Sequence, residues 1–212
     1  MIHISNREAK EMLISVLAIS VALAINIMGI GAILGDIQGL GMFTAFFLVA
    51  LGSGFILHEM AHKFTAIRFG HFAEFRMWTK GLIFMFVLAI LPTKFLFIAP
   101  GAVYIGGGMR RITVRENGII SLAGPAMNIV LAFVALGILA IVGPVMVGDS
   151  GMELWSAVAL INVFLALFNM IPIYPLDGSK VLKWSKAIYA GSAICIILLY
   201  FFLSDLIQML VI

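Results

Sequence analysis

The sequence predicts an all-α polytopic membrane protein with five transmembrane helices and one re-entrant, partly β segment. Composition is the first of three observations that lead there; the others are the apolar runs and the distribution of basic residues. Of 212 residues, 63% are hydrophobic and only 11% are charged, and the mean hydropathy is +1.18. A soluble domain is about half apolar and about a quarter charged. We therefore expect a single membrane-embedded domain over residues 1–212, with the lipid bilayer as its solvent and no nucleic-acid partner.

Five apolar runs are long enough to cross a bilayer, which takes about 20 residues. The predicted spans are Met12–Leu34, Ile37–Leu57, Gly118–Gly148, Leu154–Leu176 and Ala187–Ser204. The first run lacks a convincing cleavage site, so we expect a retained span rather than a signal peptide. Because Cys195 is the only cysteine, the chain has no internal disulfide.

The segment between Lys80 and Arg110 needs a separate interpretation. Lys94 divides it into two apolar pieces that are each too short to cross alone, and Pro92 and Pro100 interrupt a helix. A single crossing would place Lys94 in the apolar core at a cost of roughly 2.5–3.5 kcal/mol. A re-entrant element would instead enter and leave on the same side. A hairpin that crosses twice, which gives six spans, keeps the same parity.

The basic residues favour the re-entrant interpretation. With a cytoplasmic N-terminus, the inner segments then contain all 13 Lys and Arg of the chain, as the positive-inside rule requires. These residues are Arg7, Lys10, Lys63, Arg68, Arg76, Lys80, Lys94, Arg110, Arg111, Arg115, Lys180, Lys183 and Lys186. The outer loops contain only Asp36, Asp149 and Glu153. We expect a multi-pass protein of the cell membrane whose N-terminus is cytoplasmic.

The second span runs into the pentapeptide HEMAH, which contains His58, Glu59 and His62. On a helix this spacing puts two imidazoles on one face, where they can converge on Zn²⁺. Glu59 is placed to take a proton from the attacking water and to pass it to the leaving amine. A satisfied polar cluster is the alternative, but ionisable groups inside a span are costly and usually functional. We therefore predict a zinc cofactor bound by the two His, with Glu59 as the catalytic residue.

A catalytic zinc site needs a third protein ligand, and Asp177 is the remaining candidate. It follows Pro172 and Pro175, which end the fourth span at its cytoplasmic end. His58 lies roughly 26 Å along the second span, at the same end of the membrane. The PLDG sequence is otherwise an ordinary turn. The other candidates are placed in solvent, in a surface ion pair or on the outer side; they are His3, His71, Glu116, Asp36, Asp149, Glu153 and Asp205.

Amide side chains inside the spans form a further group of candidates. Asn128 lies near the start of the third span, just after Gly124 and Pro125, which permit close approach of a neighbour or a kink. Its amide either bonds a neighbouring helix or supports the substrate and transition state, and Asn169 is a weaker candidate for the same role. Asn26 and Asn162 have no comparable context and are interpreted as packing residues.

The three motifs HEMAH, GPAMN and NMIPIYPLDG together resemble the site-2 protease family of intramembrane zinc metalloproteases. The resemblance covers a catalytic core from about residue 41 to residue 180. It implies that His58, His62 and Asp177 bind zinc, that the glutamate of HEMAH is catalytic, and that the asparagine of GPAMN lies close to the site. The chain departs from the family at Ala61 and Ser179, where the family often has Gly.

The expected activity is hydrolysis of peptide bonds in or next to transmembrane segments of membrane protein substrates, near the cytoplasmic face. Phe95–Ile105 is rich in aromatic and β-branched residues and either pairs with an unwound substrate strand or packs as a plug. The main alternative is a membrane metal-ion transporter that uses the H-E-x-x-H helix as an ion site. A silent metal-binding scaffold and a prenyl-protein protease are further options. The substrate and the oligomeric state stay undetermined.

Overall fold

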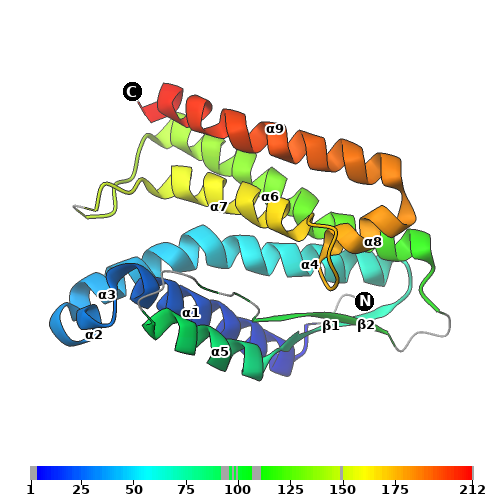
Figure 1. The fold of residues 1–212 in the computed structure, drawn as a ribbon, viewed down its shortest axis with the longest axis horizontal. Coiled ribbons are helices and arrows are strands. Elements are labelled where there is room, and N and C mark those ends of the chain that lie inside the picture. Colours follow the sequence, from blue (N-terminus) through cyan, green and yellow to red (C-terminus); the bar gives the residue numbers. More distant parts are fainter. Residues whose placement is uncertain are drawn as a thin grey trace.

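A computed structural model describes residues 4–91, 96, 98, 100–106, 111–148 and 150–211. Helix α4 (Ser53–Arg68) lies in the middle of the molecule, between two layers (Figure 1). One layer contains the helices α6 (Val114–Val142), α7 (Leu154–Asn169), α8 (Asp177–Trp184) and α9 (Lys186–Val211). The other contains α1 (Asn6–Met28), α5 (Thr79–Ile90) and the strands β1 (Phe72–Met77) and β2 (Gly101–Gly106). The predicted catalytic helix is therefore covered on both sides.

The predicted all-α polytopic class is confirmed. Within the described part of the chain, four helical stretches are long and apolar enough to cross a membrane: Asn6–Met28, Ile37–Arg68, Val114–Val142 and Lys186–Leu203. They correspond to four of the five predicted spans. The remaining one forms α7, which has 16 residues and ends at Asn169, before Pro172. Pro172 disfavours a longer helix here, since Pro lacks an N–H group and its ring clashes with the preceding turn.

The second predicted span contains a change of helix type. Helix α3 (Ile37–Phe47) begins at Asp36, whose side chain accepts the Gly39 N–H at 2.8 Å. A single π-helical turn, Leu48–Gly52, then leads into α4. Such a turn holds one extra residue and rotates the faces of the following helix. The orientation of the HEMAH residues thus depends on this turn as well as on their own spacing. A short helix, α2 (Gly31–Gly35), connects α1 to α3.

The segment after β1 returns to the end of the molecule from which it started. The two strands pair antiparallel, with Met77 opposite Gly101 and Phe72 opposite Gly106. Helix α5 has 12 residues and is about 18 Å long, too short to cross a membrane alone. The strand pairing agrees with the re-entrant, partly β interpretation and is incompatible with a single crossing. Pro92 and Lys94 lie outside the described residues.

Carboxylates from α1 close the free edge of β1. Glu8 accepts the N–H of Phe75 at 3.0 Å, and Glu11 accepts the N–H of Met77 at 2.9 Å. Glu8 also forms a buried ion pair with Lys63 of α4. Removing one partner of a buried ion pair costs free energy, because the other charge is left buried and unpaired. These contacts connect the sheet to α1 and to α4.

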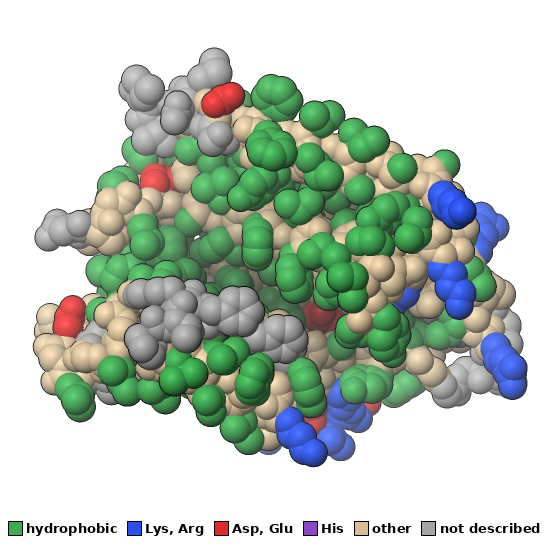
Figure 2. Space-filling view, in the orientation of Figure 1, with side chains coloured by type: hydrophobic (Ala, Val, Ile, Leu, Met, Phe, Trp, Pro, Cys, Tyr) green, Lys and Arg blue, Asp and Glu red, His purple; other side chains and the backbone are tan. Residues whose placement is uncertain are grey.

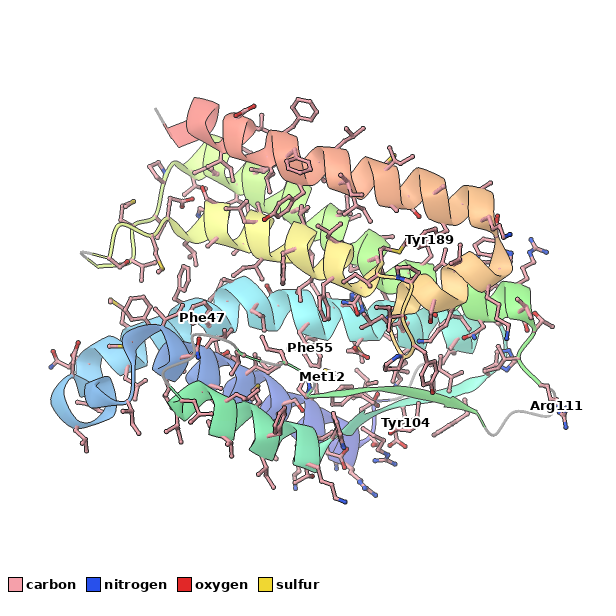
Figure 3. All side chains as sticks on the ribbon, viewed as in Figure 1. Met12, Phe47, Phe55, Tyr104, Arg111 and Tyr189 are labelled. Carbon is pink, nitrogen blue, oxygen red and sulfur yellow. The ribbon has the colours of Figure 1, made fainter. Side chains whose placement is uncertain are left out.

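Apolar side chains fill the space on both sides of α4. Met12 of α1 and Phe75 of β1 belong to one buried cluster, against which Phe55 of α4 packs (Figure 3). On the other side, Ala132 of α6 and Val163 of α7 belong to a larger cluster. The visible outer surface is mainly hydrophobic, as expected for contact with lipid (Figure 2).

Candidate active site

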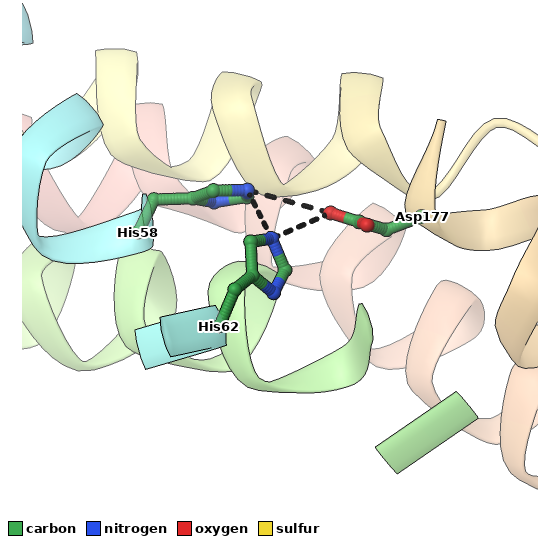
Figure 4. Close-up of side chains that lie close together, drawn as sticks. All are labelled: His58, His62 and Asp177. Carbon is green, nitrogen blue, oxygen red and sulfur yellow. Dashed lines mark hydrogen bonds and ion pairs between the residues drawn. The ribbon is translucent and has the colours of Figure 1, made fainter. Parts of the chain in front are cut away.

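Helix α4 presents both His side chains to a common point, where Asp177 meets them (Figure 4). The Nε2 atoms of His58 and His62 are 3.0 Å apart. Oδ2 of Asp177 is 3.0 Å from Nε2 of His62 and 3.4 Å from Nε2 of His58. All three side chains are buried. The structure thus brings together the three residues that the sequence predicts as metal ligands.

A close contact between α8 and the end of α7 places Asp177. It is the first residue of α8, and Gly178 follows it against the carbonyl groups that end α7. A Cβ atom added at Gly178 would lie 2.1 Å from the backbone oxygen of Met170. Because that neighbour is backbone, only Gly fits there. The other carboxylate oxygen of Asp177, Oδ1, is 3.2 Å from Nζ of Lys180.

Gly124 of α6 makes a similarly close approach, here to the two imidazole rings. A Cβ atom added at Gly124 would lie 2.5 Å from Nε2 of His62 and 2.6 Å from Cε1 of His58. The expectation that Gly124 permits close approach is met, and its neighbours are the two imidazole rings themselves. Any larger residue would push the rings away from Asp177.

The hydrogen-bond partners of the two Nδ1 atoms, which face away from Asp177, determine whether the two Nε2 atoms carry a hydrogen. Nδ1 of His62 lies 2.7 Å from the backbone oxygen of Ile120, which only accepts, so Nδ1 carries the hydrogen. Nδ1 of His58 lies 2.6 Å from Oδ1 of Asn128 and likewise donates. In neutral rings both Nε2 atoms therefore have free lone pairs.

Two lone pairs and a carboxylate oxygen that converge in this way repel one another unless a cation lies between them. These ligand atoms all lie within 4.8 Å of one another, and they form the one group of three such residues found in the described chain. Two imidazoles and a carboxylate are a donor set typical of catalytic zinc. The residues present therefore fit a zinc ion.

Glu59 follows His58 on α4, and its carboxylate contacts strand β2. Its Oε2 accepts the backbone N–H of Val103 in β2 at 2.9 Å, and the side chain is buried. Hence the catalytic candidate borders the re-entrant segment. Of the segment Phe95–Ile105, for which the sequence suggested substrate pairing, Gly101–Ile105 belongs to β2, whereas Phe95, Phe97 and Ala99 lie outside the described residues.

Two other residues that the sequence analysis considered, Asn169 and His71, lie outside the group of three candidate ligands. Asn169 donates to the backbone oxygen of Leu165 in its own helix at 2.9 Å. The expectation that His71 is solvated is wrong, since it is buried and lies 3.4 Å from Oε2 of Glu116. This pair lies apart from the three predicted ligands.

Asn162 was interpreted as a packing residue, but the structure also gives it a polar contact with Asn128, which sequence reasoning did not predict. It is completely buried, and its Oδ1 accepts from Asn128 at 2.8 Å. A signal was available, because a polar side chain inside an apolar span is costly. Asn162 also precedes Asn169 by two helical turns, on the same face of α7.

A membrane-embedded H-E-x-x-H helix, closed by a carboxylate from a separate helix, defines the site of a metalloprotease of the membrane. The model of peptidase family M50 matches residues 140–194. Over 145 residues, which are 68% of this chain and 72% of the relative, the chain is 46% identical to "Putative zinc metalloprotease MJ0611" of Methanocaldococcus jannaschii. It is 34% identical to "Putative zinc metalloprotease Rip2" of Mycolicibacterium smegmatis, over 69% of this chain and 60% of that protein. No solved structure gives a significant match.

The chain therefore belongs to peptidase family M50, the site-2 proteases. The predicted class, a zinc-dependent metalloprotease of the membrane, is confirmed.

Proposed function

We propose that this member of family M50 binds zinc through His58, His62 and Asp177 and uses Glu59 to hydrolyse peptide bonds in or next to transmembrane segments. The observation that carries this proposal is the meeting of two imidazole Nε2 atoms and one carboxylate oxygen, all buried, beside a glutamate that is not one of them. The substrate class is a membrane protein, cut near the cytoplasmic face.

The residues divide the chemistry between them. A zinc ion, when bound, supplies a Lewis acid that lowers the pKa of water and polarises a carbonyl. Glu59 then serves as general base for the attacking water and afterwards protonates the leaving amine. For Asn169, half-buried at the end of α7, we propose support of the substrate carbonyl. The contact of Asn128 with His58 supports a role in holding the ligand.

Strand β2 offers a way to hold an unwound substrate. Its Val103 N–H points away from β1 and toward Glu59. A substrate segment that loses its helical hydrogen bonds exposes backbone groups, which an open strand edge can satisfy. We propose that Gly101–Gly106 binds the substrate backbone by strand addition next to the catalytic glutamate.

Loss and recovery of cleavage with zinc test the activity. Purified protein in liposomes should cleave a membrane-anchored substrate, lose cleavage after removal of zinc by a chelator, and regain it when zinc is added back. The physical reason is that the two His and the carboxylate cannot polarise a carbonyl by themselves. Gel analysis of the products measures the result. Cleavage that persists in fully zinc-free protein would contradict the mechanism.

The charges at the two ends of the molecule support a cytoplasmic N-terminus. Lys and Arg side chains gather at one end, where Arg111 lies, and acidic side chains are seen at the opposite end (Figures 2 and 3). The positive-inside rule then places the basic end in the cytoplasm.

Cysteine labelling from each side of the membrane measures this orientation. In a Cys195→Ser background, Lys183→Cys is expected to react only from the cytoplasmic side and Ser150→Cys only from the outer side. Lys183 lies in the short helix α8, and Ser150 lies in the loop between α6 and α7, at the opposite end of the molecule (Figure 1). Labelling of position 183 from outside would overturn the orientation.

A further inference from the structure

We propose that Asn162 is a positioning residue for the zinc ligand His58. Acting through Asn128, it fixes which nitrogen of the imidazole carries the hydrogen and so keeps Nε2 free to bind metal. The proposal rests on the ligand role given to His58 above. It assigns a function to a side chain three contacts away from Asp177, on a different helix.

The directions of these hydrogen bonds follow from the first partner in the series, a backbone carbonyl group, which can only accept. Asn162 places its amide nitrogen 2.8 Å from the backbone oxygen of Val158. A carbonyl only accepts, so Nδ2 of Asn162 must face it and Oδ1 must face the other way. That oxygen lies 2.8 Å from Asn128, which must therefore present its own Nδ2.

The same logic continues to the metal ligand. With Nδ2 of Asn128 facing Asn162, and also 3.3 Å from the backbone oxygen of Gly54, its Oδ1 is the atom that faces His58. The 2.6 Å contact there requires a hydrogen on Nδ1 of His58. All the participating side chains are buried, so water is not available to replace a lost partner.

We call the hydrogen bonds from Asn162 through Asn128 to His58 the relay. A comparison with His62, the second proposed ligand, shows why His58 needs it. His62 donates directly to the backbone oxygen of Ile120, and this contact fixes its tautomer without help. His58 meets a side-chain amide, which presents either an oxygen or a nitrogen after a half rotation. Another contact of Asn128 must prevent that rotation, and Asn162 supplies the shorter of the two contacts that the Nδ2 atom of Asn128 makes.

Without Asn162, the Nδ2 atom of Asn128 keeps one partner, the backbone oxygen of Gly54 at 3.3 Å. A half rotation would then present Nδ2 to His58, and the hydrogen of the ring would move to Nε2. A protonated Nε2 cannot bind a metal ion. Loss of such supporting hydrogen bonds typically lowers metal affinity by about 10–100-fold.

Zinc affinity of three variants of α7 tests the relay. Asn162→Leu removes the acceptor and is expected to weaken zinc binding by about 10–100-fold. Asn162→Asp restores an acceptor and, as a neutral acid in the membrane, also a donor to Val158, so its affinity should stay close to wild type. Ser156→Ala is the matched control, since Ser156 is buried in the first turn of the same helix, where its backbone N–H bonds Glu153. Equal affinity of Asn162→Leu and wild type would overturn the proposal.

The tautomer itself gives a second readout that requires no cleavage. In metal-free wild-type protein labelled with ¹⁵N-histidine, the neutral ring of His58, assigned with a His58→Gln variant, should carry hydrogen on Nδ1. In Asn162→Leu a fraction should carry it on Nε2. A hydrogen on Nε2 of His58 in the wild type would refute the relay even if the Leu variant does not fold. Failure of the ligand assignment is distinguishable, because zinc would then bind equally well to His58→Gln.

Discussion

Glu59→Gln is expected to lower cleavage of a membrane-embedded substrate by about 10²–10⁴-fold, the usual effect of a lost general base, while zinc stays bound. The amide keeps the size of the side chain and an oxygen that can accept the Val103 N–H. It removes the group that takes a proton from water. Initial cleavage rates and the zinc content of the same purified samples measure the two parts of this expectation.

Glu74→Gln provides a matched control, because it removes a carboxylate on β1 whose contacts are with Ser5 and Arg76. Its cleavage rate should stay near wild type. Loss of zinc from Glu59→Gln would make Glu59 a ligand and contradict its role as base. Zinc movement across vesicles, without cleavage of any membrane substrate by the wild type, would instead favour the transporter interpretation.

The local part of the site could be predicted from the sequence. His58 and His62 are one helical turn apart, so their meeting follows from helix geometry alone. Asp177 was reached by elimination together with the expected direction of each span, and the structure places it 3.0 Å from His62. The charge pattern likewise predicted that the segment after β1 returns to its starting end, as the pairing of Met77 with Gly101 shows.

Features that depend on contacts between helices could not be predicted in this way. The relay from Asn162 to Asn128 requires that α7 and α6 pack at one particular rotation, which hydropathy does not encode. Gly124 was interpreted as a point of close approach or kinking, and only the structure shows that its neighbours are the two imidazoles. His71 was expected to be solvated because it lies near the predicted cytoplasmic surface, yet it is buried and faces Glu116.

The glycines of the two motifs, Gly124 and Gly178, each permit a close approach that the arrangement of the site needs. Gly124 lets α6 approach the imidazoles, and Gly178 lets α8 approach the end of α7 so that Asp177 reaches them. At each position a larger side chain would collide with the neighbouring element, the imidazole rings of α4 in one case and the backbone that follows α7 in the other. This gives a steric reason for the Gly residues of GPAMN and PLDG.

Asp177→Ala is expected to lower zinc affinity by more than the roughly 10–100-fold typical of a lost supporting contact, because it removes the proposed third ligand, whose Oδ2 faces both Nε2 atoms. Wild-type protein should contain about one zinc per chain, as three ligands and one open position require. Metal analysis after dialysis against a weak chelator measures the difference, with circular dichroism to show that the helices are intact. Lys180→Met is the control, since it removes the partner of Oδ1 and leaves the ligand oxygen in place. Full zinc occupancy in Asp177→Ala would exclude Asp177 from the metal site.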